Sequence, residues 1–278
     1  MDAWQPDTYA RFAAERRRPF FDLLDMVSPL PGGRAVDLGC GTGELTRELH
    51  LRTGAAETVG LDSSEAMLAK AAPLAEGGLR FERTDIAAFS PREEFDLVFS
   101  NAALHWVPDH PHLLARLAAA LRPGGQLAFQ VPDNFDHASH RAAERVAGEE
   151  PFASALGGRP HPREVRAPEA YAEILFRLGL ENPFVELRVY GHPLDSGEDV
   201  VRWVEGSLLS EYRRRLPPDL YSRFIERYRE VLFTMIPDER PYFFTFRRIL
   251  AHGRRTAAPT SVAYRSPSTT KKSDRSRM

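Results

Sequence analysis

One stretch near the amino end, Arg34 to Glu44 (RAVDLGCGTGE), constrains the fold of this chain more than any other. A short apolar run that ends at Asp37 is followed by glycine at positions 39, 41 and 43. Glycines at this spacing let the main chain turn sharply, and they let a ligand lie against it where a Cβ atom would collide. A strand, a glycine loop and a helix form the first turn of a doubly wound α/β fold, whose ligands bind at the carboxyl ends of the strands.

The same stretch also limits the ligand. Glu44 stands where a dinucleotide fingerprint has its third small residue, and its carboxylate would lie beside the phosphates of a dinucleotide. A diphosphate is therefore disfavoured, and a cationic sulfonium with a zwitterionic amino-acid arm fits better. A nicotinamide or flavin site, a binding module on the same fold and a tight turn without ligand remain as alternatives.

Residues 37–43 (DLGCGTG) resemble the first motif of the class I S-adenosylmethionine-dependent methyltransferases, and the RPGG turn at 122–125 is a second shared feature. This resemblance implies a Rossmann-like methyltransferase fold, with seven strands in a mostly parallel sheet. It also implies S-adenosyl-L-methionine as the cofactor.

Acidic residues follow the next two predicted strands. Asp62 ends the strand predicted over 57–62, about twenty residues after the glycines, where nucleotide-binding folds hold the ribose hydroxyls. Its alternative role is helix capping, which Ser63 or Ser64 can supply instead. In the methyltransferases an acid at the position of Asp85 faces the adenine amino group, although a turn-forming aspartate is the alternative. The predicted cofactor-binding residues are Asp37, Gly39, Gly41, Gly43, Asp62, Ser63, Met67, Asp85, Ile86 and Asn101.

A nearly continuous apolar run over 95–100 (FDLVFS) suits a parallel strand that is covered on both faces. It leads into Asn101, His105 and Trp106. In the methyltransferases the end of this fourth strand lies under the reactive methyl group, so these side chains are expected to meet ligand. The alternatives are helix capping for His105 and a place in the core for Trp106 and Trp203.

Two insertions depart from a minimal fold of this type. Residues 133–167 are rich in His, Pro, Gly and charge, and residues 195–239 contain amphipathic helices around 200–209 and 220–233. Helices inserted just before the last strand, 242–250, would lie over the carboxyl edge of the sheet, where a substrate-selecting cap belongs. We expect an α/β core (1–132, 168–194 and 240–253), cap insertions (133–167 and 195–239), an N-terminal lid helix within 1–20, and a disordered basic tail (254–278).

Several scattered stretches resemble the members of this family that form a methyl ester on a small polycarboxylate such as trans-aconitate. They are 4–16, 60–67 (GLDSSEAM), 100–110 (SNAALHWVPDH), 130–135 (QVPDNF) and 246–248 (FRR). The resemblance implies in-line attack by a carboxylate oxygen on the sulfonium methyl group. No catalytic base is needed, because a carboxylate is already ionised at neutral pH.

The acceptor's other carboxylates require hydrogen-bond donors and cations, for which arginine is best suited. Arg213 has the alternative of a solvated helix end, Asn134 that of a turn residue, and another acceptor atom (O, N or C) stays open. The predicted substrate contacts are Tyr9, Arg16, His105, Trp106, Gln130, Asn134, Arg213, Tyr242 and Arg247.

The composition of the chain limits the kinds of binding partner that can be expected. A formal net charge of −2 gives no electrostatic reason to expect nucleic acid or a membrane surface. The single cysteine, Cys40, excludes a disulfide framework and favours a reducing, cytoplasmic setting without a metal cluster. The amino end lacks the apolar core of a signal peptide, and no apolar run is long enough to span a bilayer. We expect a cytoplasmic monomer that acts on a small carboxylate substrate.

Overall fold

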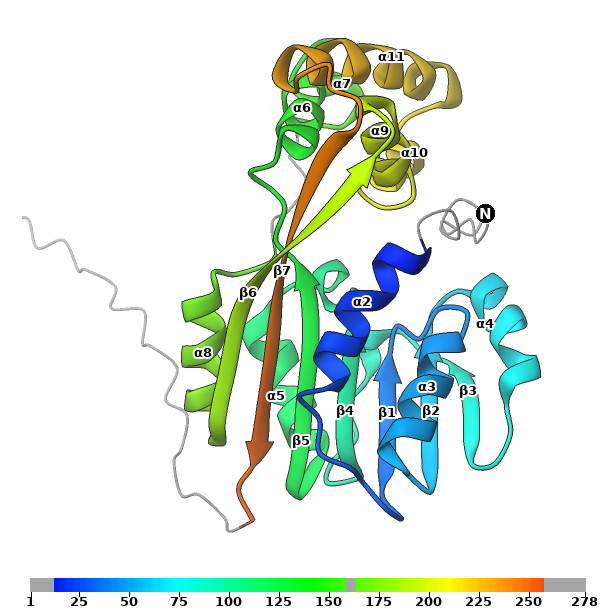
Figure 1. Ribbon diagram of the computed structural model, residues 1–278, viewed down its shortest axis with the longest axis vertical. Helices are drawn as coiled ribbons and strands as arrows, with labels where there is room; N and C mark the ends of the chain where they lie inside the picture. Colours follow the sequence, from blue (N-terminus) through cyan, green and yellow to red (C-terminus); the bar gives the residue numbers. More distant parts are fainter. Residues whose placement is uncertain (1–12, 159–163, 258–278) are drawn as a thin grey trace, which may run out of the picture.

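The computed structural model describes residues 13–158 and 164–257 (Figure 1). Seven strands form one sheet in the order β3-β2-β1-β4-β5-β7-β6, and β7 runs antiparallel to both of its neighbours. The paired strands from β3 to β5 are parallel. This confirms the predicted doubly wound, mostly parallel sheet. The strands are β1 (Arg34–Leu38), β2 (Glu57–Asp62), β3 (Leu79–Arg83), β4 (Phe95–Asn101), β5 (Leu121–Pro132), β6 (Leu180–Leu194) and β7 (Tyr242–Arg255).

Helices cover both faces of the sheet because side chains alternate along each strand. Ala35 and Leu97 pack in one apolar cluster with α2 (Ala13–Leu24) and α3 (Glu44–Thr53). Their chain neighbours Val36 and Val98 belong to a second cluster, with α5 (His110–Ala120) and α8 (Pro168–Arg177). Helix α4 (Glu65–Ala71) and the short turn η1 (Ala72–Leu74) connect β2 with β3. The short turns η2 (Ile86–Ala88) and η3 (Leu104–Trp106) place Ile86 and Leu104 against the second cluster.

In the part of the chain that the structure describes, five further helices form a separate group above the carboxyl edge of the sheet, which we call the helical cap (Figure 1). Its own apolar cluster includes Trp203, Tyr212 and Phe224, all almost fully buried. Strands β6 and β7 are long enough to reach it, since Leu194 and Phe244 belong to the same cluster. The cap helices are α6 (Ala138–Ala147), α7 (Phe152–Ala155), α9 (Gly197–Glu205), α10 (Leu208–Arg215) and α11 (Pro218–Met235).

The element boundaries differ from the sequence prediction in three places. Residues 133–167 contain α6 and α7, and residues 195–239 contain three helices, because Gly206 and Ser207 separate α9 from α10. The expected RPGG turn lies inside β5, where the pairing with β4 shifts between Phe95 and Leu97. Helix α2 extends to Leu24 and includes Pro19, so it continues beyond residue 20, where the expected lid helix ends. Residues 1–12 of that expected lid lie outside the described residues.

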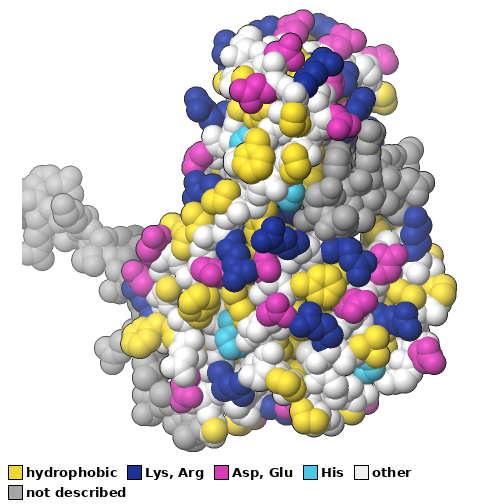
Figure 2. Space-filling view, viewed as in Figure 1, with side chains coloured by type: hydrophobic (Ala, Val, Ile, Leu, Met, Phe, Trp, Pro, Cys, Tyr) yellow, Lys and Arg dark blue, Asp and Glu magenta, His cyan; other side chains and the backbone are white. Residues whose placement is uncertain are grey.

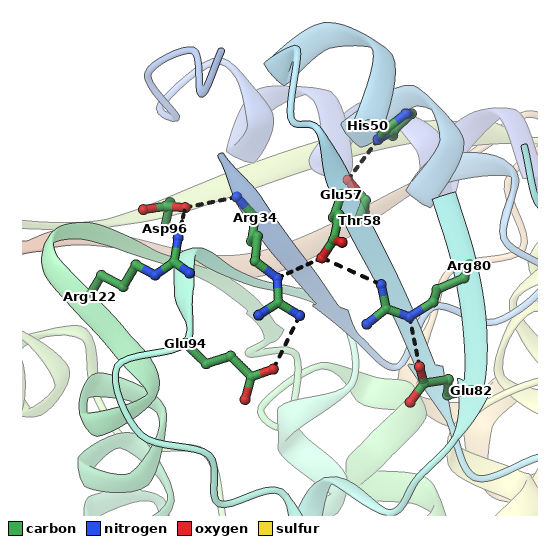
Figure 3. Close-up of polar contacts among 9 residues, drawn as sticks. All are labelled: Arg34, His50, Glu57, Thr58, Arg80, Glu82, Glu94, Asp96 and Arg122. Carbon is green, nitrogen blue, oxygen red and sulfur yellow. Dashed lines mark hydrogen bonds and ion pairs between the residues drawn. The ribbon is translucent and has the colours of Figure 1, made fainter. Parts of the chain in front are cut away.

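At the amino edge of the sheet, charged side chains of neighbouring strands pair with one another (Figure 3). Arg34 donates to Glu57 at 2.6 Å and lies 3.3 Å from Glu94, while Asp96 accepts from the Arg34 amide at 2.8 Å and from Arg122 at 3.0 Å. Partly exposed pairs of this kind contribute about 1 kcal/mol or less each. These charges are therefore paired with one another at the amino ends of the strands.

None of the helices in residues 13–158 and 164–257 has both the length and the apolar character that a membrane span requires.

Candidate active site

A cavity of about 520 Å³ lies at the carboxyl ends of β1 to β4, and we call it the main cavity. Parallel strands bring their carboxyl ends to one edge of the sheet, so residues far apart in sequence meet there. Gly43 is absent from its lining. The other predicted cofactor-binding residues line it: Asp37, Gly39, Gly41, Asp62, Ser63, Met67, Asp85, Ile86 and Asn101.

The three loop glycines have different structural roles. All three have positive φ, which an L side chain adopts only with strain. A Cβ on Gly39 would lie 2.2 Å from the Cβ of Ala103, and one on Gly43 would lie 2.6 Å from the ring of Phe81. A Cβ on Gly41 would meet nothing within 4 Å. Gly39 and Gly43 thus allow close packing of the loop, whereas Gly41 leaves main chain bare towards the main cavity.

Asp62 joins the glycine loop to the next helix. One carboxylate oxygen accepts from the Gly41 amide at 2.9 Å, and the other accepts from the Ser64 amide at 2.9 Å. The cap of α4 is Ser64, whose hydroxyl accepts from the Met67 amide at 3.2 Å. A carboxylate has room for further donors beyond these two. Asp62 can therefore hold the loop in place and still offer an acceptor to hydroxyl groups in the main cavity.

Asp37 is the most deeply buried acid of the main cavity, with 3% of its surface exposed. Burial raises the pKa of Asp37 to about 7, an effect that a hydrogen bond from Thr46 at 2.7 Å opposes and the nearby Asp62 carboxylate reinforces. Near neutral pH the group is therefore balanced between its charged and neutral forms. A cation in the main cavity would favour the charged form.

Two other loop residues behave as ordinary structural groups with a face on the main cavity. Asp85 caps the turn η2, because one of its oxygens accepts from the Ala87 amide at 2.8 Å. The Asp85 side chain is exposed, so its second oxygen remains available to a ligand. Burial raises the pKa of the Cys40 thiol far above its ordinary value, and the residue stays an uncharged space-filling group.

Beyond the end of β4 the main cavity adjoins a second, small cavity of about 70 Å³. Asn101, Ala102 and Trp106 line both. Ala102 has a φ of 54°, and its amide donates to the carbonyl of Gln130 at 3.0 Å. Strained backbone of this kind persists where the surrounding structure enforces it. The end of β4 is therefore the place where the two cavities meet.

The small cavity lies between the sheet and the helical cap. Pro132 comes from β5, Phe246 and Arg248 come from β7, and Trp203 and Ser207 come from the cap. His105 also lines it, with its ring 4.6 Å from that of Trp106. The predicted contacts His105 and Trp106 are thus brought together here.

The other predicted substrate contacts lie elsewhere. Arg247 forms an ion pair with Asp133 at 2.8 Å, and its amide donates to Asn134 at 3.0 Å. Gln130 is fully buried beside the small cavity's Arg248. Tyr242 is buried in the apolar cluster of the cap.

The remaining candidates are on the cap and at the amino end. The Arg213 guanidinium lies over the ring of Tyr221, 5.2 Å from its centre, and lines neither cavity. Arg16 belongs to α2, but its side chain, like all of Tyr9, is outside the described residues.

Sequence reasoning missed several residues that line the cavities. Arg248 is the clearest case, because side chains alternate along a strand and Phe244, Phe246 and Arg248 share one face of β7. That alternation was a usable signal. Arg214 and Ser210 of α10 reach the main cavity, and nothing in their local sequence indicates it.

The chemistry of the main cavity fits S-adenosylmethionine. Bare main chain at Gly41 offers close approach, Asp37 suits a cation, and Asp62 can accept hydrogen bonds from hydroxyl groups. Ile86 and Met67 supply apolar surface for a base. Among the described residues, no group of three or more His, Cys, Asp or Glu side chains is arranged to hold a metal ion.

Two solved structures share the fold. The YcgJ protein from Bacillus subtilis aligns with a TM-score of 0.59 at 16% identity, over 86% of this chain and 99% of that one. A phosphoethanolamine N-methyltransferase from Haemonchus contortus, solved with S-adenosyl-L-methionine, aligns with a TM-score of 0.51 at 19% identity, over 86% of this chain and 52% of that one. At such identities the likeness concerns the fold alone.

Sequence comparison identifies the family. The Methyltransferase domain family matches residues 35–125. Proteins named trans-aconitate 2-methyltransferase match much more of the chain. The one from Deinococcus radiodurans is 45% identical over 89% of this chain and 96% of its own length. Those from Variovorax paradoxus and Mycobacterium tuberculosis are 42% and 38% identical, over 81% and 88% of this chain and 87% and 94% of their own lengths.

Fold, glycine loop and family match together define a class I S-adenosylmethionine-dependent methyltransferase. Within that class, the chain belongs to the trans-aconitate 2-methyltransferase family. This confirms the resemblance inferred from the sequence, including the cofactor that it implied.

Proposed function

We propose that the protein transfers a methyl group from S-adenosylmethionine to a carboxylate oxygen of trans-aconitate and so forms a methyl ester. The observation that carries this proposal is the meeting of the main and small cavities at Asn101, Ala102 and Trp106. A donor in the main cavity and an acceptor in the small cavity would share that wall. The names of the relatives support trans-aconitate as the acceptor.

For the donor we propose contacts that follow the lining of the main cavity. Bound S-adenosylmethionine supplies an electrophilic methyl group on its sulfonium. Asp62 accepts hydrogen bonds from the ribose hydroxyls, Asp85 from the adenine amino group, and Asp37 faces the positive charge of the amino-acid arm. Gly39 and Gly41 provide main chain, Gly43 lets α3 begin close to the sheet, and Ser63, Met67, Ile86 and Asn101 complete the lining.

The protein's own contribution to the reaction is alignment. The acceptor carboxylate, with a pKa of about 4, is already ionised at neutral pH, so no side chain has to remove a proton. Holding two reactants in a productive geometry can lower a barrier by roughly 7–11 kcal/mol. Asn101, His105 and Trp106 would hold the acceptor at the shared wall, and the cap would exclude water. The other acceptor contacts predicted from the sequence remain predictions.

The test is a methyl-transfer assay with labelled S-adenosylmethionine and a panel of di- and tricarboxylates. We expect trans-aconitate to give the fastest transfer and a labelled product that mild base hydrolyses, because esters are base-labile. A base-stable product would contradict carboxyl methylation and would favour an N- or C-methyl acceptor instead.

We also propose that the chain acts as a cytoplasmic monomer that does not bind nucleic acid, with the core, lid, cap and tail boundaries given above. The net charge of −2 and the mixture of basic and acidic side chains over the face shown in Figure 2 support the absence of nucleic-acid binding. Light scattering during size-exclusion chromatography tests the monomer. A dimer mass would contradict it.

A further inference from the structure

Arg247 and Arg248 are neighbours on β7 with different surroundings. The Arg247 guanidinium is 2.8 Å from the Asp133 carboxylate and forms an ion pair with it. Arg248 is only 6% exposed and lines the small cavity. Since side chains alternate along a strand, one of the two faces the small cavity and the other is directed away from it.

The described contacts of Arg248 hold its guanidinium in a fixed orientation. It donates to the side-chain carbonyl of Gln130 at 3.3 Å, and it lies over the ring of Phe246, 4.6 Å from the ring centre. Gln130 is fully buried, and its amide nitrogen has no hydrogen-bond partner among the described residues. A planar guanidinium stacked on a ring presents its N–H groups in one plane, which matches the two oxygens of a carboxylate.

The cap side of the small cavity is also favourable for an anion. Gly206 and Ser207 line it, and Ser207 is the residue that precedes α10. The amino end of a helix carries partial positive charge from its unpaired N–H groups. A buried arginine on the core side and a helix amino end on the cap side therefore face one space. That space adjoins the main cavity at Asn101 and Trp106.

We propose that Arg248 binds a carboxylate of the acceptor other than the one that is methylated, and that Gln130 positions its guanidinium. The site then selects acceptors with a second carboxylate at a fixed distance from the reacting one. This inference rests on the proposed function, because it places the acceptor in the small cavity. It assigns the acceptor-binding role to Arg248 rather than to Arg247.

The first experiment compares Arg248→Met with Arg247→Met, and uses trans-aconitate and the monocarboxylate crotonate as acceptors. Losing one partner of a buried charged hydrogen bond weakens binding by about thirtyfold or more. We expect Arg248→Met to raise the KM for trans-aconitate by at least that factor, and to change turnover of crotonate by about twofold or less. Arg254→Met is the matched control, because Arg254 lies on the same strand and donates to Gly124 and Ser28, away from both cavities.

A near-isosteric variant tests the positioning role of Gln130. Gln130→Glu would place a carboxylate against Arg248 that competes with the acceptor. We expect a higher KM for trans-aconitate with unchanged kcat, and an unchanged KM for crotonate. A purely structural role for Gln130 would change stability, or affect both acceptors alike, and would overturn this assignment.

Folding and donor binding are checked separately. Each variant should retain the melting temperature and the S-adenosylhomocysteine affinity of the wild type. If Arg247→Met loses trans-aconitate selectivity and Arg248→Met does not, the proposed role of Arg248 is wrong. It is also wrong if Arg248→Met affects both acceptors equally.

Failure of the proposed function would look different. The wild-type protein would then form no methyl ester from any carboxylate. Binding of the acceptor carboxylate by Arg248 would still be measured by titrating trans-aconitate into the complex with S-adenosylhomocysteine. Wild-type binding that Arg248→Met abolishes would support this role of Arg248, and equal binding by both proteins would overturn it.

Discussion

The main cavity and the small cavity meet at Asn101, yet they are assembled from the chain in different ways. Most of the main cavity comes from residues 37–107, at the ends of consecutive parallel strands. The small cavity combines residues from the end of β4, the end of β5, the cap and the middle of β7, which lie up to 147 positions apart between Asn101 and Arg248. The main cavity is formed mostly by neighbouring strands of the sheet. The small cavity forms only when the cap is packed over the sheet.

With the donor in the main cavity and the acceptor in the small one, as proposed, this difference would let one fold keep a donor and change its acceptor. The main cavity depends on glycine geometry and strand ends, where few substitutions are tolerated. The small cavity depends on side chains from inserted helices, whose sequence can vary while the sheet stays intact. Apart from Ser210 and Arg214, which line the main cavity, substitutions in the cap should therefore affect the acceptor and stability, whereas substitutions in the loop should affect the donor.

The largest effect is expected from Phe224→Ala in the cap. Phe224 is fully buried and stacks on Tyr212 with ring centres 4.7 Å apart. Removing a buried phenylalanine lowers the free energy of unfolding by about 3–5 kcal/mol. Urea denaturation measures this, and calorimetry should show S-adenosylhomocysteine affinity within about twofold of wild type.

The matched control for this variant is Phe233→Ala on the same helix. Phe233 is 41% exposed, and its loss should lower the free energy of unfolding by about 1 kcal/mol or less. Donor affinity that falls together with stability in Phe224→Ala would mean that the cap and the main cavity are not independent.

Gly39→Ala tests the loop. The added Cβ would lie 2.2 Å from Ala103 at a backbone φ of 79°, so the loop must shift out of the main cavity. We expect donor affinity to fall by about a hundredfold or more, read by calorimetry with S-adenosylhomocysteine.

Two further variants separate steric clash from backbone strain in the loop. Combining Gly39→Ala with Ala103→Gly removes the clash and should recover part of the lost affinity. Gly124 has a φ of 82°, and a Cβ added there would meet nothing within 4 Å. Gly124→Ala should therefore leave donor affinity unchanged. No recovery in the double variant would show that backbone strain alone is responsible.

Asp62→Ala removes the acceptor of the Gly41 and Ser64 amides together with the proposed ribose contact. Hydrogen bonds to a charged acceptor are worth about 1.5–3 kcal/mol, so donor affinity should fall by at least about tenfold. Asp62→Asn, which keeps one oxygen, should be intermediate. Unchanged affinity in both variants would rule out the ribose assignment.

The smallest effect concerns pH. Because burial raises the pKa of Asp37 to about 7 from 3.8, the folded protein binds a proton there that the unfolded chain releases above pH 4. Its contribution to the free energy of unfolding is therefore full below pH 4 and declines as the pH rises to 7. A cationic donor should bind the ionised form better, so affinity should fall by up to about tenfold from pH 8 to pH 6.

Asp37→Asn supplies the reference for this pH dependence. The variant should flatten both the stability profile and the donor-affinity profile, measured by denaturation and calorimetry across pH 4 to 8. The difference between wild type and variant isolates Asp37 from the donor's own amino group, which also titrates in this range. Parallel profiles would assign the pH dependence to another group.

The fold was largely predictable because its signals are local. The apolar runs at 57–62 and 95–100 became β2 and β4, and Asp62 and Asn101 at their ends line the main cavity as expected. Helix counts in the cap were less predictable. The amphipathic pattern does not mark the break at Gly206 and Ser207, and the short α6 and α7 are stabilised by tertiary packing rather than by their own propensity.

The acceptor side shows where prediction from the sequence ends. Arginines 247 and 248 carry the same charge and flank the same peptide bond, so composition gives no reason to prefer one of them. Their difference comes from the side of β7 on which each lies, from Asp133 beside one and from Gln130 and Phe246 beside the other. Asp133 and Gln130 are each more than a hundred positions away from the arginine that they contact.

The sequence by itself determined most of the main cavity, because a glycine loop and acids at strand ends obtain their geometry from the backbone of adjacent residues. Only the tertiary structure decided the small cavity, since its lining is chosen by which faces of β7 and α9 are packed against each other. Backbone geometry is encoded over a few residues, whereas packing depends on contacts between segments that are distant along the chain.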